Sequence, residues 1–399
     1  MRIIMKHFLL TIAILLAGCQ KTLNPTDIDI AEAIENTSEE ALATSDYFSE
    51  TEYIPLETND LSIIGKAPHV VVTKDVFIVS SLQQPLKIFN RHTGKYIGDV
   101  GSIGEGPKEY IKGSFGEVYF WVDQSTQNIY VLGVDNNFLV YNNNGHYIDR
   151  IKVNPKYNLY SYNFLIEDGE IWGHNVMHTD KEAASIIYID GKDNNVQEIM
   201  TWETDLMPMD DCIDSSFMLG NYVAYGGHLY ILKFTDDRKG VSVTGNPSLW
   251  KHDGEIKIKQ AYNDTIYTLS TSGIAPHQTL SLGKWHCDEA DRFQMGTDKI
   301  SVNYILEGNN YLYFHLCQGL YSSKPEEIYS GFYDKSKQQM SLMKGNKMRD
   351  LSNNQDLSVR AVTPEGGFCA LIQPYHLSDK NKERLNVDDE ANPIIVIMK

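Results

Sequence analysis

Two segments in the first half of the chain follow one plan, and this repeat limits the folds that the chain can adopt. The segments are Phe77–Val100 and Ile129–Ile151. Each contains an apolar run, a polar turn, a second run ending in an aromatic residue, a turn with glycine and a Tyr-Ile pair. Ile97 of the first corresponds to Ile148 of the second, an offset of 51 residues. Repeats of about 40 to 50 residues with several strands each are typical of β-propeller blades.

The rest of the chain has the sequence pattern of an all-β protein. Short runs rich in Val, Ile, Tyr and Phe alternate with turns rich in Asn, Asp and Gly, without a long helical period. Aromatic residues pack well on the pleated surface of a β-sheet, so the 24 tyrosines are consistent with an all-β fold. The chain after residue 50 would hold six blades of roughly 58 residues or seven of roughly 50, and the longer later units favour six.

We therefore predict a six-bladed β-propeller of four-stranded antiparallel blades over residues 51–399. The ring is expected to close where the segment Thr51–Glu57 pairs with the last strand, within Asn392–Lys399. Closure of this kind removes the open edges of the sheets.

The first 18 residues have the organisation of a bacterial lipoprotein signal peptide. Arg2 and Lys6 precede the apolar run Phe8–Ala17, which is too short for a transmembrane helix of roughly 20 residues. The sequence Leu-Ala-Gly-Cys ends at Cys19 and matches the lipobox. Several acyl chains, such as palmitate, on one cysteine anchor a protein stably, whereas one chain binds marginally. We predict cleavage after residue 18 and lipid attachment at Cys19; the alternative is an ordinary cleaved signal in which Cys19 is incidental.

Residues 19–50 are predicted to form a flexible tether between the lipid and the propeller. They are rich in Asp, Glu, Ser and Thr, and their first aromatic residue is Tyr47. Such a composition buries too little apolar surface to offset the entropy of ordering the chain. A short helix within residues 31–45 is the most structure that we expect there.

The net charge of −18 comes from 53 acidic and 35 basic residues. A chain this acidic repels a phosphate backbone, and no basic run offsets the repulsion, so nucleic acid is not a predicted partner.

Four cysteines follow Cys19 without CxxC pairs or zinc-site spacing: Cys212, Cys287, Cys317 and Cys369. Disulfide pairing in an exported protein and burial as small apolar side chains are both open.

The glycines Gly101, Gly104 and Gly106 raise the question of a phosphate-binding loop. A dinucleotide fingerprint requires a helix that begins within the motif. Here the following segment is again strand-like, Pro107 removes an amide donor, and no Gly-Lys-Ser/Thr is present. We interpret the glycines as positive-φ turn residues between two blades.

No metal site, cofactor or catalytic motif is predicted. His174 and His178 lie four residues apart, but the glutamate of a HExxH site is missing. Two acidic segments, 204–214 and 386–390, lack the calcium-loop ladder and are interpreted as acidic loops. Asp264 is interpreted as a turn residue that bonds local backbone. There is no Gly-x-Ser-x-Gly elbow, although glycosidases use carboxylates that are far apart in sequence.

Several motifs together point to one family. They are Tyr53–Thr58, Phe89–Tyr110, Ala261–Trp285 and Asp388–Lys399. With them the chain resembles the six-bladed β-propeller lipoproteins of Bacteroides and relatives, whose blades are similar to NHL repeats. The resemblance covers nearly all of the chain after the signal and implies a propeller fold, export and a setting in nutrient, especially glycan, handling. It implies no reaction and no catalytic residues.

A propeller presents side chains at one end of its central channel, on the innermost strands and the loops beside them. Four polar residues are predicted there as ligand-binding candidates: His69, Asn163, Asn303 and Arg360. We predict a monomeric module of the cell envelope that is anchored to the membrane through Cys19 and binds a glycan, peptide or protein. The alternatives are a hydrolase or lyase with its active site at the channel mouth, and a scaffold that docks a partner on one face.

The predicted location is the periplasmic face of the outer membrane. No acidic cluster follows Cys19 directly, and the resemblance implies such a cluster for surface-exported lipoproteins. The cell surface is the alternative.

Overall fold

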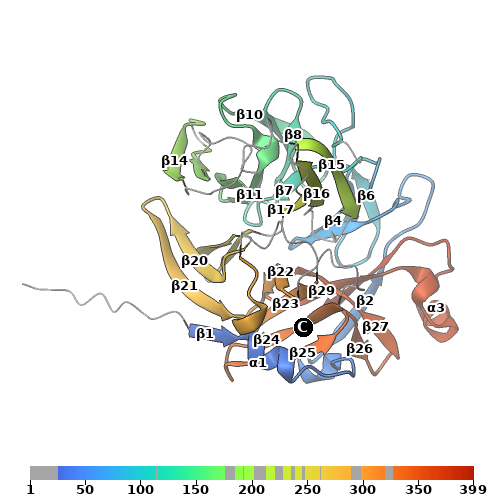
Figure 1. The fold of residues 1–399 in the computed structure, drawn as a ribbon. Helices are drawn as coiled ribbons and strands as arrows, with labels where there is room; N and C mark the ends of the chain where they lie inside the picture. The colour runs from blue at the N-terminus through green and yellow to red at the C-terminus, as the bar shows by residue number, and fades with distance from the viewer. Residues whose placement is uncertain are drawn as a thin grey trace, which may run out of the picture.

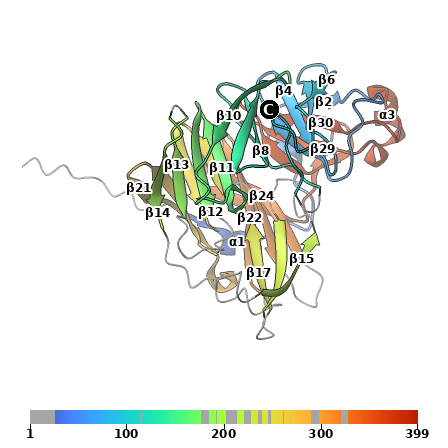
Figure 2. The ribbon, with the colours of Figure 1, turned by 90° about the horizontal axis from the view of Figure 1, so that it is seen from above.

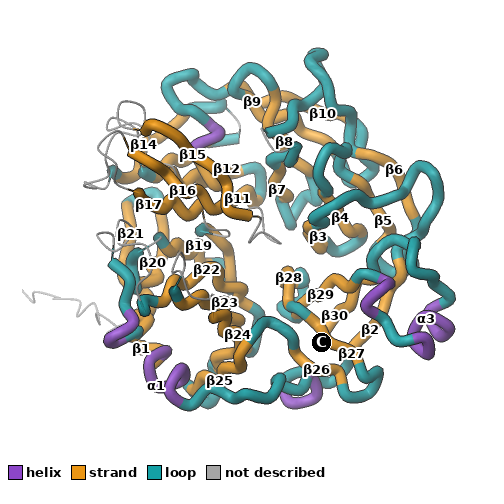
Figure 3. Tube along the Cα trace, turned by 45° about the vertical axis from the view of Figure 1, so that its right-hand side comes forward, coloured by secondary structure: helices purple, strands orange, loops and turns teal. Residues whose placement is uncertain are grey.

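The strands of the chain form a ring of six β-sheet blades in a computed structural model (Figure 1, Figure 3). The structure describes residues 26–113, 116–175, 185–191, 193–201, 213–220, 228–234, 239–244, 248–260, 262–288, 298–319 and 327–399. The predicted six-bladed propeller of four-stranded antiparallel blades is thereby confirmed.

The first three blades follow one another along the chain. Blade one contains β3 (His69–Val72), β4 (Val76–Ser80), β5 (Lys87–Asn90) and β6 (Tyr96–Asp99). Blade two contains β7 (Phe120–Val122), β8 (Ile129–Gly133), β9 (Asn137–Tyr141) and β10 (Tyr147–Lys152). Blade three contains β11 (Tyr162–Glu167), β12 (Glu170–Asn175), β13 (Ile186–Ile189) and β14 (Val196–Met200).

The last three blades complete the ring. Blade four contains β18 (Leu249–His252), β19 (Glu255–Lys259), β20 (Thr265–Ser270) and β21 (Gly273–Ser281). Blade five contains β22 (Ile300–Glu307), β23 (Tyr311–Gln318), β24 (Glu327–Asp334) and β25 (Gln339–Lys344). Blade six contains β28 (Val359–Val362), β29 (Phe368–Ile372), β30 (Ile394–Met398) and β2 (Thr51–Pro55). The first strand of each blade lies innermost: β3 contacts β28, and β11 contacts both β7 and β18.

Blade six closes the ring as predicted. Its outer strand β2 pairs antiparallel with β30, from Thr51 opposite Met398 to Pro55 opposite Ile394. The two strands come from distant parts of the chain, so no hairpin turn joins them. Every other blade has its third and fourth strands consecutive in sequence, and this difference shapes the candidate site described below.

The sequence repeat corresponds to a contact between neighbouring blades. Gly94 and Gly145 lie in the turns before the outer strands of blades one and two, with φ of 67° and 79°. A Cβ atom at these positions would lie 2.0 Å from the Pro55 carbonyl oxygen and 2.1 Å from that of Asp99. Each turn thus docks on the outer strand of the preceding blade, which requires glycine at both positions.

Residues 26–50 form an ordered belt around the outside of blades four to six (Figure 1). The belt contains β1 (Thr26–Asp29), α1 (Ile30–Glu35) and η1 (Thr44–Asp46). β1 pairs in parallel with β21, and Ser38 bridges to Met343 in β25. The flexible tether predicted over these residues is therefore wrong, because Ile28 and Ile30 are fully buried and the backbone covers open sheet edges. Cys19 and the rest of the tether lie outside the described residues.

Two smaller sheets lie outside the ring. β15 (Ile213–Gly220), β16 (His228–Phe234) and β17 (Lys239–Thr244) form an antiparallel sheet between blades three and four in sequence. Figure 2 shows this sheet projecting from the body of the propeller. β26 (Met348–Asp350) pairs with β27 (Gln355–Leu357).

The remaining elements are short helices. They are η2 (Leu159–Ser161), η3 (Gly283–Trp285), η5 (Pro374–His376) and α3 (Asp379–Leu385). Within the described ranges, no helix combines the length and the apolar character needed to cross a membrane.

Candidate ligand site

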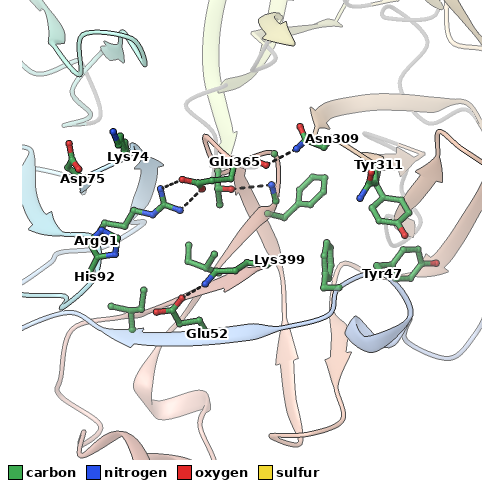
Figure 4. Close-up of a pocket in the computed structure, with 18 residues that line it drawn as sticks. Tyr47, Glu52, Lys74, Asp75, Arg91, His92, Asn309, Tyr311, Glu365 and Lys399 are labelled. Carbon is green, nitrogen blue, oxygen red and sulfur yellow. Dashed lines mark hydrogen bonds and ion pairs between the residues drawn. The ribbon is translucent and has the colours of Figure 1, made fainter. Parts of the chain in front are cut away.

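A pocket of about 540 Å³ lies where the ring closes. We call it the closing-blade pocket. It is lined by β2 and β30, by the belt, and by turns of blades one, five and six (Figure 4). Blade six has no hairpin turn between β30 and β2, and Glu52 and Lys399, which lie near this break, both line the pocket. The pocket therefore lies at the closure of the ring.

One wall of the pocket is aromatic. Tyr47 of the belt and Tyr311 at the start of β23 pack edge to face, with ring centroids 5.4 Å apart at 75°. Both rings are partly exposed, whereas Phe48 and Phe368 beneath them are buried. Edge-to-face pairs hold rings in defined orientations, so the two tyrosines form a fixed apolar platform at the pocket surface.

The opposite wall contains a bidentate ion pair between an arginine and a glutamate. Arg91 Nη1 donates to Glu365 Oε1 at 2.8 Å, and Nη2 donates to Oε2 at 2.5 Å. Arg91 also donates to the Thr73 carbonyl at 2.9 Å, and only 9% of its side chain is exposed. The hydrogen bonds from Arg91 lower the pKa of Glu365, against the effect of partial burial. The carboxylate is thus held in place and charged.

A second ion pair lies at the base of the pocket. Lys399 Nζ lies 2.7 Å from Glu52 Oε2 and 3.8 Å from Glu50 Oε2. The hydrogen bond with Glu52 raises the pKa of Lys399. Figure 4 shows this pair and the Arg91–Glu365 pair facing the tyrosines across the pocket. Because these charges are already paired, the pocket offers hydrogen-bonding groups, and these groups need no charged ligand to balance them.

The four predicted ligand-binding residues all lie on innermost strands, but none lines this pocket. They are His69 in β3, Asn163 in β11, Asn303 in β22 and Arg360 in β28. The His69 ring lies 6.0 Å from the Phe120 ring, and Asn163 Oδ1 accepts a hydrogen bond from Trp121 at 3.5 Å. Asn303 lies beside His315, and the charge of Arg360 also acts on His315, while His69 and Asn163 lie on other blades. Their role in ligand binding stays a prediction.

The glycine-rich loop is a turn, and the side chain of Glu109 in the same loop bonds to it. Glu109 accepts hydrogen bonds from the Gly106 amide at 2.8 Å and from Ser102 Oγ at 3.2 Å. The Gly106 amide is thus already bonded within the loop. Gly101 has the predicted positive φ, at 48°, but Gly104 and Gly106 do not.

Several other predicted features can be placed. His174 is buried in β12, while His178 and Cys212 lie outside the described residues. Asp264 forms an ion pair with His286 Nδ1. The predicted bond from its side chain to local backbone is therefore wrong, because the segment after β21 returns His286 to this turn.

The described residues bear on disulfide pairing and on metal binding. No disulfide joins Cys287, Cys317 and Cys369 to one another. Across the described ranges, no group of three or more His, Cys, Asp and Glu side chains is arranged to hold a metal ion.

The family of the chain follows from a comparison over its whole folded length. The model of the family described as a domain of unknown function, DUF4934, matches residues 25–399. The chain therefore belongs to this family. A search of curated proteins gave no match.

Solved structures with a similar fold include a crystal structure of a "Putative exported protein" from Bacteroides fragilis. It is 17% identical, with a TM-score of 0.62 over 91% of this chain and 97% of the other. The β-propeller domain of Cps50 (Swd1) from Myceliophteria thermophila is 9% identical, with a TM-score of 0.39 over 87% and 99% of the two chains. The first of these structures supports the propeller fold.

Proposed function

For this member of the DUF4934 family, we propose a role as an exported, lipid-anchored binding module of the cell envelope, with a glycan as the ligand of the closing-blade pocket. The propeller fold commonly serves as an interaction module, and the similar Bacteroides fragilis structure is described as an exported protein. Fold alone does not define a ligand, so the choice of ligand rests on the pocket.

This proposal rests on the two walls of the pocket, one formed by aromatic rings and the other by charged side chains that are already ion-paired. The rings of Tyr47 and Tyr311 are suited to the apolar C–H faces of a sugar ring. The exposed carboxylate of Glu365 and the ammonium of Lys399 keep free acceptor and donor positions for hydroxyl groups. A neutral ligand rich in hydroxyl groups fits both walls, and a volume of about 540 Å³ holds a short oligosaccharide segment.

Binding to the chain from Gln20 onward, which contains every described element, tests the proposal. Neutral oligosaccharides, peptides and divalent metal ions are screened by thermal shift, because a ligand of the folded state raises the melting temperature. We expect a shift with an oligosaccharide. Tyr311→Ala is expected to weaken its binding at least about tenfold. Tyr375→Ala is the matched control, since Tyr375 is 59% exposed and does not line the pocket.

The other outcomes lead to different assignments. A shift with peptides that depends on Tyr311 would replace the glycan with a peptide ligand. A shift that is equal in wild type and Tyr311→Ala would place the ligand site elsewhere. Turnover of a bound oligosaccharide would favour the hydrolase or lyase alternative, in which two carboxylates act at the scissile bond. No shift in any class would favour a scaffold that docks a protein.

Lipid attachment at Cys19 is the anchoring part of the proposal. Its support is the basic start, short apolar run and lipobox in the first 19 residues. The belt begins at Thr26, seven positions after Cys19, and seven residues reach at most about 25 Å. The propeller would therefore be held close to the membrane.

Labelling of cells with an alkyne analogue of palmitate tests the anchor. We expect label on the wild-type chain and none on Cys19→Ala, which should leave the membrane fraction. Label on both would overturn the assignment to Cys19. External protease added to intact cells addresses the leaflet: rapid loss of the folded domain would favour the cell surface over the proposed periplasmic face.

A further inference from the structure

The innermost strands of blades five and six each contain a β-bulge at a polar residue. In β22, Val302 lies opposite Leu316 and Tyr304 lies opposite His315, so Asn303 is the extra residue. In β28, Val359 lies opposite Ala370 and Ala361 lies opposite Cys369, so Arg360 is the extra residue. β22 and β28 contact one another. Bulges redirect side chains and are frequent beside functional sites.

Arg360 is a partly buried guanidinium for which the described residues provide no counter-ion. Within the described part of the chain it makes neither a hydrogen bond nor an ion pair, although its surroundings leave it only partly exposed. A guanidinium has five N–H donors, and a partly desolvated charge without a partner is costly. The chain has 53 acidic residues against 35 basic ones. No acidic side chain of the described residues pairs with Arg360, so its guanidinium keeps donors that an external anion could use.

The groups around Arg360 favour an anion and not a cation. Asn303 Nδ2 lies 3.4 Å from His315 Nδ1, and the Tyr304 ring stacks on the His315 ring with centroids 4.6 Å apart. Burial lowers the pKa of His315 to about 4, with a smaller effect from the charge of Arg360. His315 is thus neutral near pH 7, and the guanidinium is the charged group of the cluster.

We propose that Arg360, with Asn303 on the neighbouring innermost strand, binds a carboxylate group of a small ligand on the axial side of blades five and six. The planar fork of a guanidinium matches the two oxygens of a carboxylate. Phosphate has similar geometry but carries more charge, and the net charge of −18 repels it more strongly. This site is distinct from the closing-blade pocket, and none of its residues lines that pocket.

Glucuronate is the probe, and glucose is its uncharged counterpart. At constant ionic strength set with sodium chloride, glucuronate is expected to raise the melting temperature of the wild-type chain, and glucose is not. Arg360→Gln should weaken glucuronate binding at least about tenfold in calorimetric titration, and Arg360→Lys should weaken it less because the charge remains. Arg384→Gln is the matched control at an exposed arginine and should bind as the wild type does.

A second measurement separates binding from stability. Because Arg360 has no hydrogen bond or ion pair to lose within the described ranges, Arg360→Gln without ligand should melt at the wild-type temperature or above it. Wild type that fails to respond to glucuronate would overturn the proposal, as would an equal response of Arg360→Gln. An equal response to sulfate, lost in Arg360→Gln, would overturn the carboxylate assignment. Tyr311→Ala should leave the response unchanged, so this site and the pocket can fail independently.

Discussion

Arg91 of blade one and Glu365 of blade six form a two-pronged ion pair across the closure of the ring. Comparable ion pairs join two other blade interfaces, from Lys251 to Glu167 at 3.4 Å and from Lys257 to Glu307 at 2.8 Å. In each case the glutamate lies at the end of an innermost strand or in the turn that follows it. Ion pairs at the same end of the ring thus join these neighbouring blades, in addition to the apolar contacts between them.

Arg91→Ala should lower the free energy of unfolding by about 2 kcal/mol, because a buried side chain loses charge-assisted bonds to Glu365 and a bond to Thr73. Urea denaturation at pH 7 measures the change. The control is Arg349→Ala, whose pair with Asp356 is more exposed, with 34% and 45% of the side chains accessible. Surface pairs contribute less than about 1 kcal/mol. Equal losses in the two variants would contradict a special role for Arg91 at the closure.

Glu307 should make stability depend on pH below neutrality. Burial alone would raise the pKa of Glu307, but Lys257, Lys335 and Trp250 outweigh it and lower the pKa from 4.5 to about 2. The stabilisation is fully present above the unfolded pKa and is lost as the pH falls from about 4.5 toward 2. By linkage it amounts to about 3 kcal/mol.

Denaturation of Glu307→Gln and wild type at a series of pH values measures this effect. At pH 7 the variant should be less stable by about 3 kcal/mol, and the difference should shrink through the acid range. Glu383→Gln, at an exposed position on α3, is the control and should follow the wild type. A difference that is constant with pH would mean that the charge of Glu307 is not what stabilises this interface.

Local pattern predicted the fold because each blade repeats the same local contacts. The glycines at 94 and 145 meet the preceding blade in the same way, so the same residue recurs at both positions. Closure by the segment at Thr51 could be predicted for a similar reason, since a ring needs a strand for its last blade.

The candidate pocket could not be predicted from the sequence. Arg91 and Glu365 are 274 positions apart, and Tyr47 meets Tyr311 only because the belt passes beside blade five. No periodicity marks such residues. The belt itself carried a signal, since Ile30, Ala33 and Ile34 share one face of a short helix and are all buried. Its acidic composition concealed this pattern.

The belt should contribute to global stability, in contrast to a flexible tether. Ile30 is fully buried at the start of α1, and truncation of a buried isoleucine leaves a cavity. We expect Ile30→Ala to lower the free energy of unfolding by about 2 to 4 kcal/mol. Leu61→Ala is the control, since Leu61 is 72% exposed. If Ile30→Ala unfolds at the same urea concentration as Leu61→Ala, the belt does not hold the propeller together.

Thiol labelling should distinguish the three described cysteines. Burial raises the pKa of both Cys317 and Cys369 to about 12, so almost no reactive thiolate is present at neutral pH. Cys287 is partly exposed. A maleimide reagent should label Cys287 in the native protein, and Cys317 and Cys369 only after denaturation, as read by peptide mass spectrometry. The denatured sample is the internal control. Rapid native labelling of Cys317 or Cys369 would show that the blades around β23 and β29 open readily. A disulfide between any two of the three would contradict their reduced state in the structure.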